Sequence, residues 1–231
     1  MTTHDFAARL HKAVADRTAI DALGVPDLAT GYAVQRELRA SAGPLVGWKL
    51  GVTSRAKQAQ VGVDSPIYGF LEGANALDLG APLDTSALIQ PRCEPEIVFV
   101  LGRDLTGPHV TAADVIAASS GVAVGIEVLD SRYRDYKFTM PDVVADNTSA
   151  GRFVVGTPVP PAGIDLRLVG VVLEKNGELV ATASGAASLG HPAAAVAWMV
   201  RTMSADGEGL RAGDVVVASV DRLGTLELAV R

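Results

Sequence analysis

The sequence is poor in cysteine and contains no long hydrophobic run. Its one cysteine, Cys93, excludes an intrachain disulfide and a zinc site made of several cysteines. We expect Cys93 to be a small buried side chain, with a reactive thiol as the alternative. No apolar stretch reaches the ~20 residues of a membrane span, and the first residues lack the basic and apolar segments of a signal peptide. These absences predict a cytoplasmic protein without a membrane partner.

Positive charge is also scarce. The 231 residues include 20 Lys and Arg against 26 Asp and Glu, which gives a net charge of −6. Because binding to nucleic acid requires a basic face, nucleic acid is not expected as a partner. The sequence also lacks a Walker loop, a G-x-G-x-x-G turn, a G-x-S-x-G elbow and an H-E-x-x-H helix. The common nucleotide-binding, serine hydrolase and zinc protease signatures therefore do not apply.

Hydrophobic residues make up 48% of the chain, enough to build a core. Apolar spacing predicts helices over 3–15, 27–40, 54–60, 111–119 and 191–203. It predicts strands over 45–52, 94–101, 122–129, 152–155, 166–175, 178–183, 214–219 and 224–230, with a hairpin turn at Asn176-Gly177. The pattern indicates one continuous domain, with a helical N-terminal part and first strand over 1–65 and a β-rich core over 66–231.

Three glutamates lie in or beside strongly apolar segments. Glu94 and Glu96 open the run 97–101, and Glu127 lies inside the run 122–129. Side chains alternate along a strand, so Glu94 and Glu96 share one face. Burying three carboxylates requires a shared cation, and oxygen ligands favour Mg²⁺ or Mn²⁺. The alternative is that each strand has one polar face and the glutamates lie on it.

Other polar residues stand close to these segments. Lys49 lies in an apolar stretch flanked by glycines, where partial desolvation suits acid–base chemistry; the alternative is a lysine that reaches solvent from a strand end. The segment 130–138, rich in cations, and the polar segment 142–149 follow Glu127. Each of these two segments either lines the site or is an ordinary surface loop. We expect His191, before Pro192, to begin a helix.

Several motifs along the chain resemble one known family. They are GWKLGVTS at 47–54, GVDSPIYG at 62–69, RCEPE at 92–96, EVLDSR at 127–132, ADNTS at 145–149 and LGHP at 189–192. Together they resemble the 2-keto-4-pentenoate hydratase / 2-oxo-3-hexenedioate decarboxylase family of the fumarylacetoacetate hydrolase superfamily.

The resemblance implies an α+β fold, a mixed β-roll or barrel with a small helical N-terminal part. It implies an Mg²⁺ or Mn²⁺ ion held by Glu94, Glu96 and Glu127, a homo-oligomer, and a possible complex between hydratase and decarboxylase. The predicted catalytic residues are Lys49, Asp142, Asp146 and Ser149, and the predicted substrate contacts are Leu50, Ile67, Arg132 and Lys137.

The implied substrate is a 2-oxo acid, and two reactions share that chemistry. The decarboxylase of the family converts 2-oxo-3-hexenedioate (4-oxalocrotonate) to 2-hydroxypenta-2,4-dienoate in meta-cleavage catabolism, and the hydratase adds water to that dienol. Family hydratases commonly carry aspartate after the proline of the G-V-D-x-P segment, where this chain has Ile67. An apolar residue there favours loss of CO₂, because it desolvates the distal carboxylate. We therefore expect a decarboxylase, with the hydratase as the alternative.

The C-terminal segment departs from the family pattern. Gly213-Asp214 leads through 215–217 directly into 218–224, and a loop and a second Gly-Asp turn of the family are missing. In the family that loop helps to wall the site. A third hypothesis is therefore a catalytically impaired homologue that serves as an assembly partner.

Overall fold

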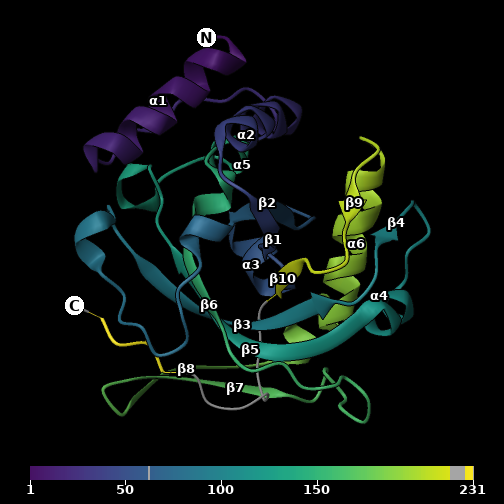
Figure 1. The fold of residues 1–231 in the computed structure, drawn as a ribbon. Coiled ribbons are helices and arrows are strands. Elements are labelled where there is room, and N and C mark those ends of the chain that lie inside the picture. Colours follow the sequence, from purple (N-terminus) through teal and green to yellow (C-terminus); the bar gives the residue numbers. More distant parts are fainter. Residues whose placement is uncertain (62, 219–226, 231) are drawn as a thin grey trace.

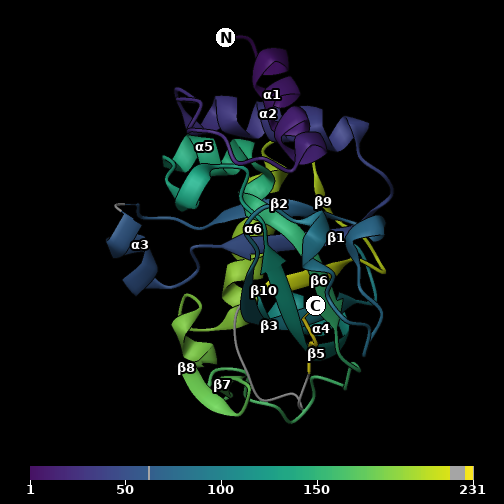
Figure 2. The same ribbon diagram turned by 90° about the vertical axis from the view of Figure 1, so that its left-hand side faces the viewer.

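The computed structural model describes residues 1–61, 63–218 and 227–230, and it combines a curled β-sheet with helices on one face and at one end (Figures 1 and 2). The helices are α1 (Thr3–Asp16), α2 (Leu28–Ser41), α3 (Arg55–Val61), α4 (Ala112–Ala118), α5 (Met140–Ala145) and α6 (Pro192–Ser204). The strands are β1 (Leu45–Gly51), β2 (Ile67–Glu72), β3 (Arg92–Leu101), β4 (Leu105–Thr106), β5 (Ser119–Leu129), β6 (Ala150–Val155), β7 (Gly170–Lys175), β8 (Glu178–Ser184), β9 (Gly209–Leu210) and β10 (Val215–Ala218). Short 3₁₀ turns include η3 (Arg134–Tyr136) and η4 (Asn147–Ser149).

Six strands form the main sheet in the order β2-β1-β10-β3-β5-β6. Among the strand pairs of this sheet in the described residues, only β1–β10 is parallel, so the sheet is mixed. The sheet curls until its two ends approach each other: Ala76, just beyond β2, bridges to Phe153 of β6, and Leu77 donates a backbone hydrogen bond to Phe153. This arrangement confirms the expected β-roll of α+β class.

The two faces of the curled sheet bury different residues. The convex face carries side chains such as Phe99, Val122 and Val216, which join the main core together with Val196 and Met199 of α6. On the concave face a smaller apolar cluster fills part of the space; its members are Leu71, Val98, Ala123, Phe153 and Val217. Because side chains alternate along a strand, Glu94 and Glu96 fall on the same concave face as Val98.

The helices begin where the sequence supplies side-chain caps. Thr2, Thr111 and Thr139 each cap a helix and pair with an aspartate three residues later in a capping box. His191 caps α6, as expected: its Nδ1 accepts a hydrogen bond of 3.0 Å from the backbone N–H of Ala193. Helices α1, α2 and α5 gather at one end of the sheet, opposite the β7–β8 hairpin (Figure 1).

Most elements expected from the sequence are present, often longer or shorter by a few residues. Asn176 and Gly177 both have positive φ, 54° and 80°, which is the conformation of the expected hairpin turn. Strand β2 and helix α5 were missed, because each is short, β2 directly follows Pro66, and α5 includes Pro141 in its first turn. The first strand, β1, lies inside the main sheet between β2 and β10. The division of the chain at residue 65 stays a prediction.

One expectation needs correction, and two others fall on residues outside the described ranges. Cys93 is exposed rather than buried, because the first three residues of β3 all extend to solvent. The strand expected over 224–230 includes 224–226, which lie outside the described residues; of the remaining positions, Val230 bridges to Leu83. The shortened connection expected after 218 also falls in the region outside the described residues. In the described ranges, no helix is long and apolar enough to cross a membrane.

Candidate metal centre

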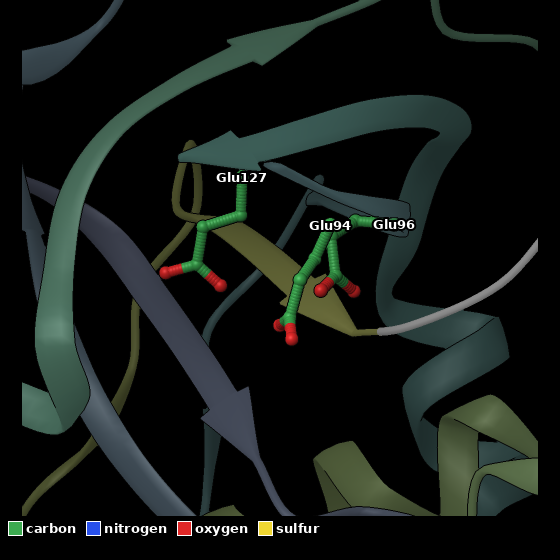
Figure 3. A group of neighbouring side chains, drawn as sticks. All are labelled: Glu94, Glu96 and Glu127. Carbon is green, nitrogen blue, oxygen red and sulfur yellow. The ribbon is translucent and has the colours of Figure 1, made fainter. Parts of the chain in front are cut away.

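Three carboxylates converge on the concave face of the sheet (Figure 3). Glu94 of β3 lies directly opposite Glu127 of β5 in the antiparallel register, and Glu96 follows one pleat further along, opposite Gly125. Each of the three offers an oxygen within 4.8 Å of the other two. A Cβ added at Gly125 would lie 2.6 Å from a methyl carbon of Val98 and 3.8 Å from Cβ of Glu96. Glycine at this position therefore leaves room for the cluster.

The cluster concentrates negative charge where water has little access. Glu96 and Glu127 are 2% and 1% exposed, whereas Glu94 is exposed at the opening. Burial, followed by the charge of Glu94, raises the pKa of Glu127 to about 7, although the Lys49 ammonium opposes the shift. Like charges directly opposite on neighbouring strands destabilise a sheet. The cluster therefore requires a neutralising cation.

Lys49 supplies part of that positive charge from across the sheet. Its Nζ lies 2.9 Å from Oε1 of Glu127, and both side chains are almost completely buried. Strands β1 and β5 are separated by β10 and β3, a distance of about 14 Å on a flat sheet at ~4.8 Å per strand. The contact forms because the sheet curls, and it overturns the alternative that Lys49 reaches solvent.

The ammonium of Lys49 is also held by the turn η4. It donates a hydrogen bond of 3.1 Å to the carbonyl oxygen of Thr148. Asn147, Thr148 and Ser149 all have positive φ, of 50°, 52° and 57°, a conformation that costs ~1 kcal/mol or more for each non-glycine residue. Two hydrogen bonds between the Asn147 amide and the backbone of Phe70, of 2.8 and 3.0 Å, hold the turn in place.

Two glycines make room for this turn against β1 and β2. A Cβ added at Gly51 would lie 2.8 Å from the methyl group of Thr148, and one at Gly69 would lie 2.7 Å from the carbonyl oxygen of Asn147. The Thr148 hydroxyl also donates to the carbonyl oxygen of Tyr68, at 2.9 Å. Close packing against the turn therefore requires glycine at both positions, Gly51 two residues after Lys49 and Gly69 two residues after Ile67.

The donor set suits a hard divalent cation. Its three side chains offer only carboxylate oxygens, the ligands that Mg²⁺ and Mn²⁺ prefer. Oε2 of Glu127 is buried and makes no hydrogen bond within the described part of the chain. A buried carboxylate oxygen without a donor is costly unless a cation meets it. The residues present therefore fit a divalent ion.

The other predicted catalytic residues lie in structural networks. Asp142 caps α5: its Oδ2 accepts from Thr139 Oγ1 at 2.6 Å and its Oδ1 from the Val25 N–H at 3.0 Å. Asp146 is fully buried against the Arg132 guanidinium, and the Ser149 hydroxyl donates to it at 3.4 Å. Burial raises the pKa of Asp146 to about 6, against the opposing charge of Arg132.

Of the four predicted substrate contacts, Arg132 and Leu50 lie outside the glutamate cluster. The Arg132 guanidinium donates to the Asp146 side chain and to the carbonyl oxygens of Asp130, Ala150 and Asp146. It is a buried structural cation rather than a free anion-binding group. Leu50 is next to Lys49 in β1, so alternation turns it to the opposite face, where it joins the main core.

The other two predicted substrate contacts differ, because Lys137 is exposed and Ile67 is buried. The Lys137 side chain is 82% exposed and lies 3.4 Å from Asp135, so it belongs to a solvated loop. Ile67 is buried and lies close to Gly51 and to the Thr148 methyl group. It also borders a cavity of about 390 Å³, whose other lining residues are Leu28, Val63, Asp64, Ser65 and Met140.

Sequence reasoning missed the backbone carbonyl of Thr148 and the side chain of Asn147. Both act through a turn with positive φ, and nothing in the residue types of this segment indicates that conformation. Arg92, two residues before Glu94 on the same strand, was also not predicted as a site residue. The alternation that placed Glu94 and Glu96 together also places Arg92 with them, so this signal was available.

Comparison with known proteins agrees with the fold and the site. The family model described as fumarylacetoacetate (FAA) hydrolase C-terminal matches residues 46–231. The chain is 45% identical to a 4-oxalocrotonate decarboxylase of Pseudomonas sp. strain CF600, over 83% of this chain and 75% of that protein. It is 43% identical to a 2-keto-4-pentenoate hydratase of Burkholderia vietnamiensis, over 91% and 84% of the two chains.

A solved structure extends the likeness to the whole chain. The 4-oxalocrotonate decarboxylase from Pseudomonas putida G7, complexed with magnesium and adipate, superposes with a TM-score of 0.91 at 36% identity and covers 99% of this chain and 97% of that one. The curled sheet and its helical cover are thus the fold of the fumarylacetoacetate hydrolase superfamily. The chain belongs to the fumarylacetoacetate hydrolase family, among the relatives named 4-oxalocrotonate decarboxylase and 2-keto-4-pentenoate hydratase.

Proposed function

We propose that the chain is a lyase dependent on a divalent metal, which decarboxylates 2-oxo-3-hexenedioate to 2-hydroxypenta-2,4-dienoate. The observation that carries the proposal is the convergence of Glu94, Glu96 and Glu127 within 4.8 Å, with the Lys49 ammonium 2.9 Å from Glu127. The likeness to relatives named 4-oxalocrotonate decarboxylase supports the choice of reaction.

The three glutamates would hold Mg²⁺ or Mn²⁺. When bound, such an ion supplies Lewis acidity, which stabilises the negative charge that develops on the oxygen of a 2-oxo acid. The proposed reaction breaks the bond between the distal carboxylate and its neighbouring carbon. The bonding electrons pass along the conjugated chain to the 2-oxygen, CO₂ leaves, and the 2-oxygen takes up one proton to give the dienol.

Lys49 is the group placed to deliver that proton. An ammonium has three N–H donors, and here one is used by Thr148 while Glu127 lies against another side of the group. At least one N–H therefore remains for a substrate oxygen. Because Nζ is buried and anchored twice, it needs little reorganisation during the reaction.

Ile67 supports decarboxylation over hydration. It is 3% exposed, and a Cβ placed at Gly51 would lie 3.1 Å from Cγ1 of Ile67 and 2.8 Å from the Thr148 methyl group, so an apolar side chain stands near the residue that holds Lys49. An apolar wall excludes the water molecule that hydration would require. We do not assign Asp142, Asp146 or Ser149 a step, because their oxygens are engaged in structural hydrogen bonds.

The hydratase is the second candidate, because relatives at 43–47% identity bear that name. It would consume 2-hydroxypenta-2,4-dienoate and leave the dicarboxylate untouched. A substrate panel separates the two: each compound is added with and without Mg²⁺ to the wild-type protein and to Glu96→Gln. Loss of the conjugated absorbance together with CO₂ release supports the decarboxylase. A folded, metal-loaded protein that turns over neither compound contradicts both and favours an impaired homologue.

Assembly and location are part of the same proposal. We infer a homo-oligomer that associates with a hydratase, as the family resemblance implies, and that resides in the cytoplasm. Light scattering on the purified chain tests the first point. Co-purification with a co-expressed hydratase of the same pathway tests the association, and recovery of both proteins as separate monomers would contradict it.

A further inference from the structure

The proposed substrate carries a second carboxylate, and this inference rests on that proposed function. The two cations expected to bind this carboxylate are occupied or distant. Arg132 uses its guanidinium on Asp146 and on backbone carbonyl oxygens, and Lys137 lies in solvent beside Asp135. Another positive group must therefore meet the far end of a dicarboxylate.

Arg92 stands on the face of β3 that carries the metal centre. Residues 92, 94 and 96 alternate to the same side of the strand, so Arg92 lies beside Glu94 on the face of β3 that carries the metal centre. Two residues along a strand span about 7 Å. This spacing is close to the distance between the two ends of a six-carbon dicarboxylate.

Within the described part of the chain, the Arg92 guanidinium is held by stacking and its N–H groups make no hydrogen bond. Its central carbon lies 3.8 Å from the centroid of the Tyr136 ring, in a cation–π contact. The Tyr136 hydroxyl donates a hydrogen bond of 3.0 Å to the carbonyl oxygen of Gln90, which fixes the ring. Arg92 is exposed, and within the described ranges its guanidinium makes no ion pair. A stacked guanidinium with free N–H groups is preorganised for a carboxylate.

The charge balance of the site points to the same role. Three glutamates, one lysine and one divalent ion sum to zero, and a dicarboxylate would add two negative charges. Arg92 is a positive charge on this face that no carboxylate of the described chain neutralises. We propose that Arg92, stacked on Tyr136, binds the second carboxylate of a 2-oxo dicarboxylate and so makes the site select dicarboxylates over monocarboxylates.

The test is a comparison of two ligands that cannot be decarboxylated by this route. Saturated 2-oxoadipate and 2-oxohexanoate have the same length but differ in the second carboxylate, and calorimetry in the presence of Mg²⁺ gives the Kd of each. In the wild-type protein we expect 2-oxoadipate to bind about 10- to 100-fold more tightly, the scale of one charge-assisted bidentate contact. Arg92→Gln should abolish this ratio and leave the Kd of 2-oxohexanoate unchanged.

Three further variants sharpen the result. Arg92→Lys keeps the charge but lacks the planar fork, so it should retain only part of the ratio. Tyr136→Leu removes the stacking partner and should also lower it. Arg167→Gln, an exposed arginine paired with Asp165 on the surface, is the matched control and should leave the ratio intact. The proposal is overturned if the ratio of the two Kd values survives in Arg92→Gln. It is also overturned if this variant weakens the binding of both ligands equally.

The binding readout is independent of turnover. If the wild-type protein discriminates between the two ligands but decarboxylates nothing, the role of Arg92 stands and the proposed reaction fails. If the protein decarboxylates the dicarboxylate while Arg92→Gln retains the preference, the reaction stands and the role of Arg92 fails.

Discussion

Lys49 donates its hydrogen bond of 3.1 Å to the carbonyl oxygen of Thr148, a β-branched residue held at a φ of 52°. β-branched residues rarely adopt positive φ. The conformation persists because the Asn147 amide makes two hydrogen bonds with the backbone of Phe70, and the Thr148 hydroxyl donates a hydrogen bond to the carbonyl oxygen of Tyr68. A strained turn thus aims one carbonyl oxygen at the proposed proton donor.

Replacing Asn147 tests the purpose of this turn. Asn147→Ala removes two buried hydrogen bonds and leaves the N–H and carbonyl groups of Phe70 without partners, so we expect a loss of about 2–4 kcal/mol in the free energy of unfolding. If the turn positions Lys49, kcat should fall at least tenfold at temperatures where the variant is folded, with KM nearly unchanged. Asn75→Ala, at a half-buried surface contact with Arg152, is the control. An unchanged kcat in folded Asn147→Ala would show that the turn is only structural.

Removal of one carboxylate should abolish tight metal binding. Glu96→Gln keeps the shape of the side chain but loses a negative ligand, so we expect Mg²⁺ affinity to fall at least tenfold. Calorimetry and the Mg²⁺-dependent rise in Tm report the change, since a ligand stabilises the folded state in proportion to its binding. Glu178→Gln, on the exposed β8 strand, should behave like the wild-type protein. Equal Tm shifts in both variants would contradict the assignment of Glu96.

Metal binding should depend on pH through Glu127. Its pKa is raised to about 7 by burial and by Glu94, so below that pH the carboxyl group holds a proton that competes with the metal. In the metal-free protein this shift stabilises the fold at low pH, and that contribution is lost as the pH rises from about 4.5 through 7. The Mg²⁺ affinity should therefore fall up to tenfold per pH unit below about 7. A Kd that is constant from pH 5 to 8 contradicts the prediction.

Asp146 should matter for folding. Asp146→Ala leaves the buried Arg132 guanidinium without its carboxylate, a change that costs about 3–5 kcal/mol in comparable buried pairs. Denaturant unfolding measures the loss. Asp165→Ala, which breaks an exposed pair with Arg167, should leave the free energy of unfolding nearly unchanged, because solvent screens an exposed ion pair. If Asp146→Ala retains full stability but loses activity, then Asp146 acts in catalysis, as the sequence first suggested.

The expected and observed roles of individual residues show where the sequence was sufficient. Alternation along 94–101 placed Glu94 and Glu96 together, and the run around Glu127 placed it in a strand; the structure brings the three within 4.8 Å. The same rule, applied to β1, would have excluded Leu50 and, applied to β3, would have included Arg92. The alternation rule does not apply to the polar segments 130–138 and 142–149. Asp142 and Asp146 resemble site residues by type, but they serve as a helix cap and as the partner of Arg132.

By itself the sequence determined most of the strands, the caps of α4 and α6 and the common face of Glu94 and Glu96, because these follow from local periodicity and side-chain chemistry. Only the tertiary structure decided that Lys49 would meet Glu127 across three strand spacings and that Thr148 would turn its carbonyl oxygen towards the ammonium. Both contacts depend on how far the sheet curls and on a backbone conformation that packing imposes. Those are properties of the whole fold, which no short segment of the chain encodes.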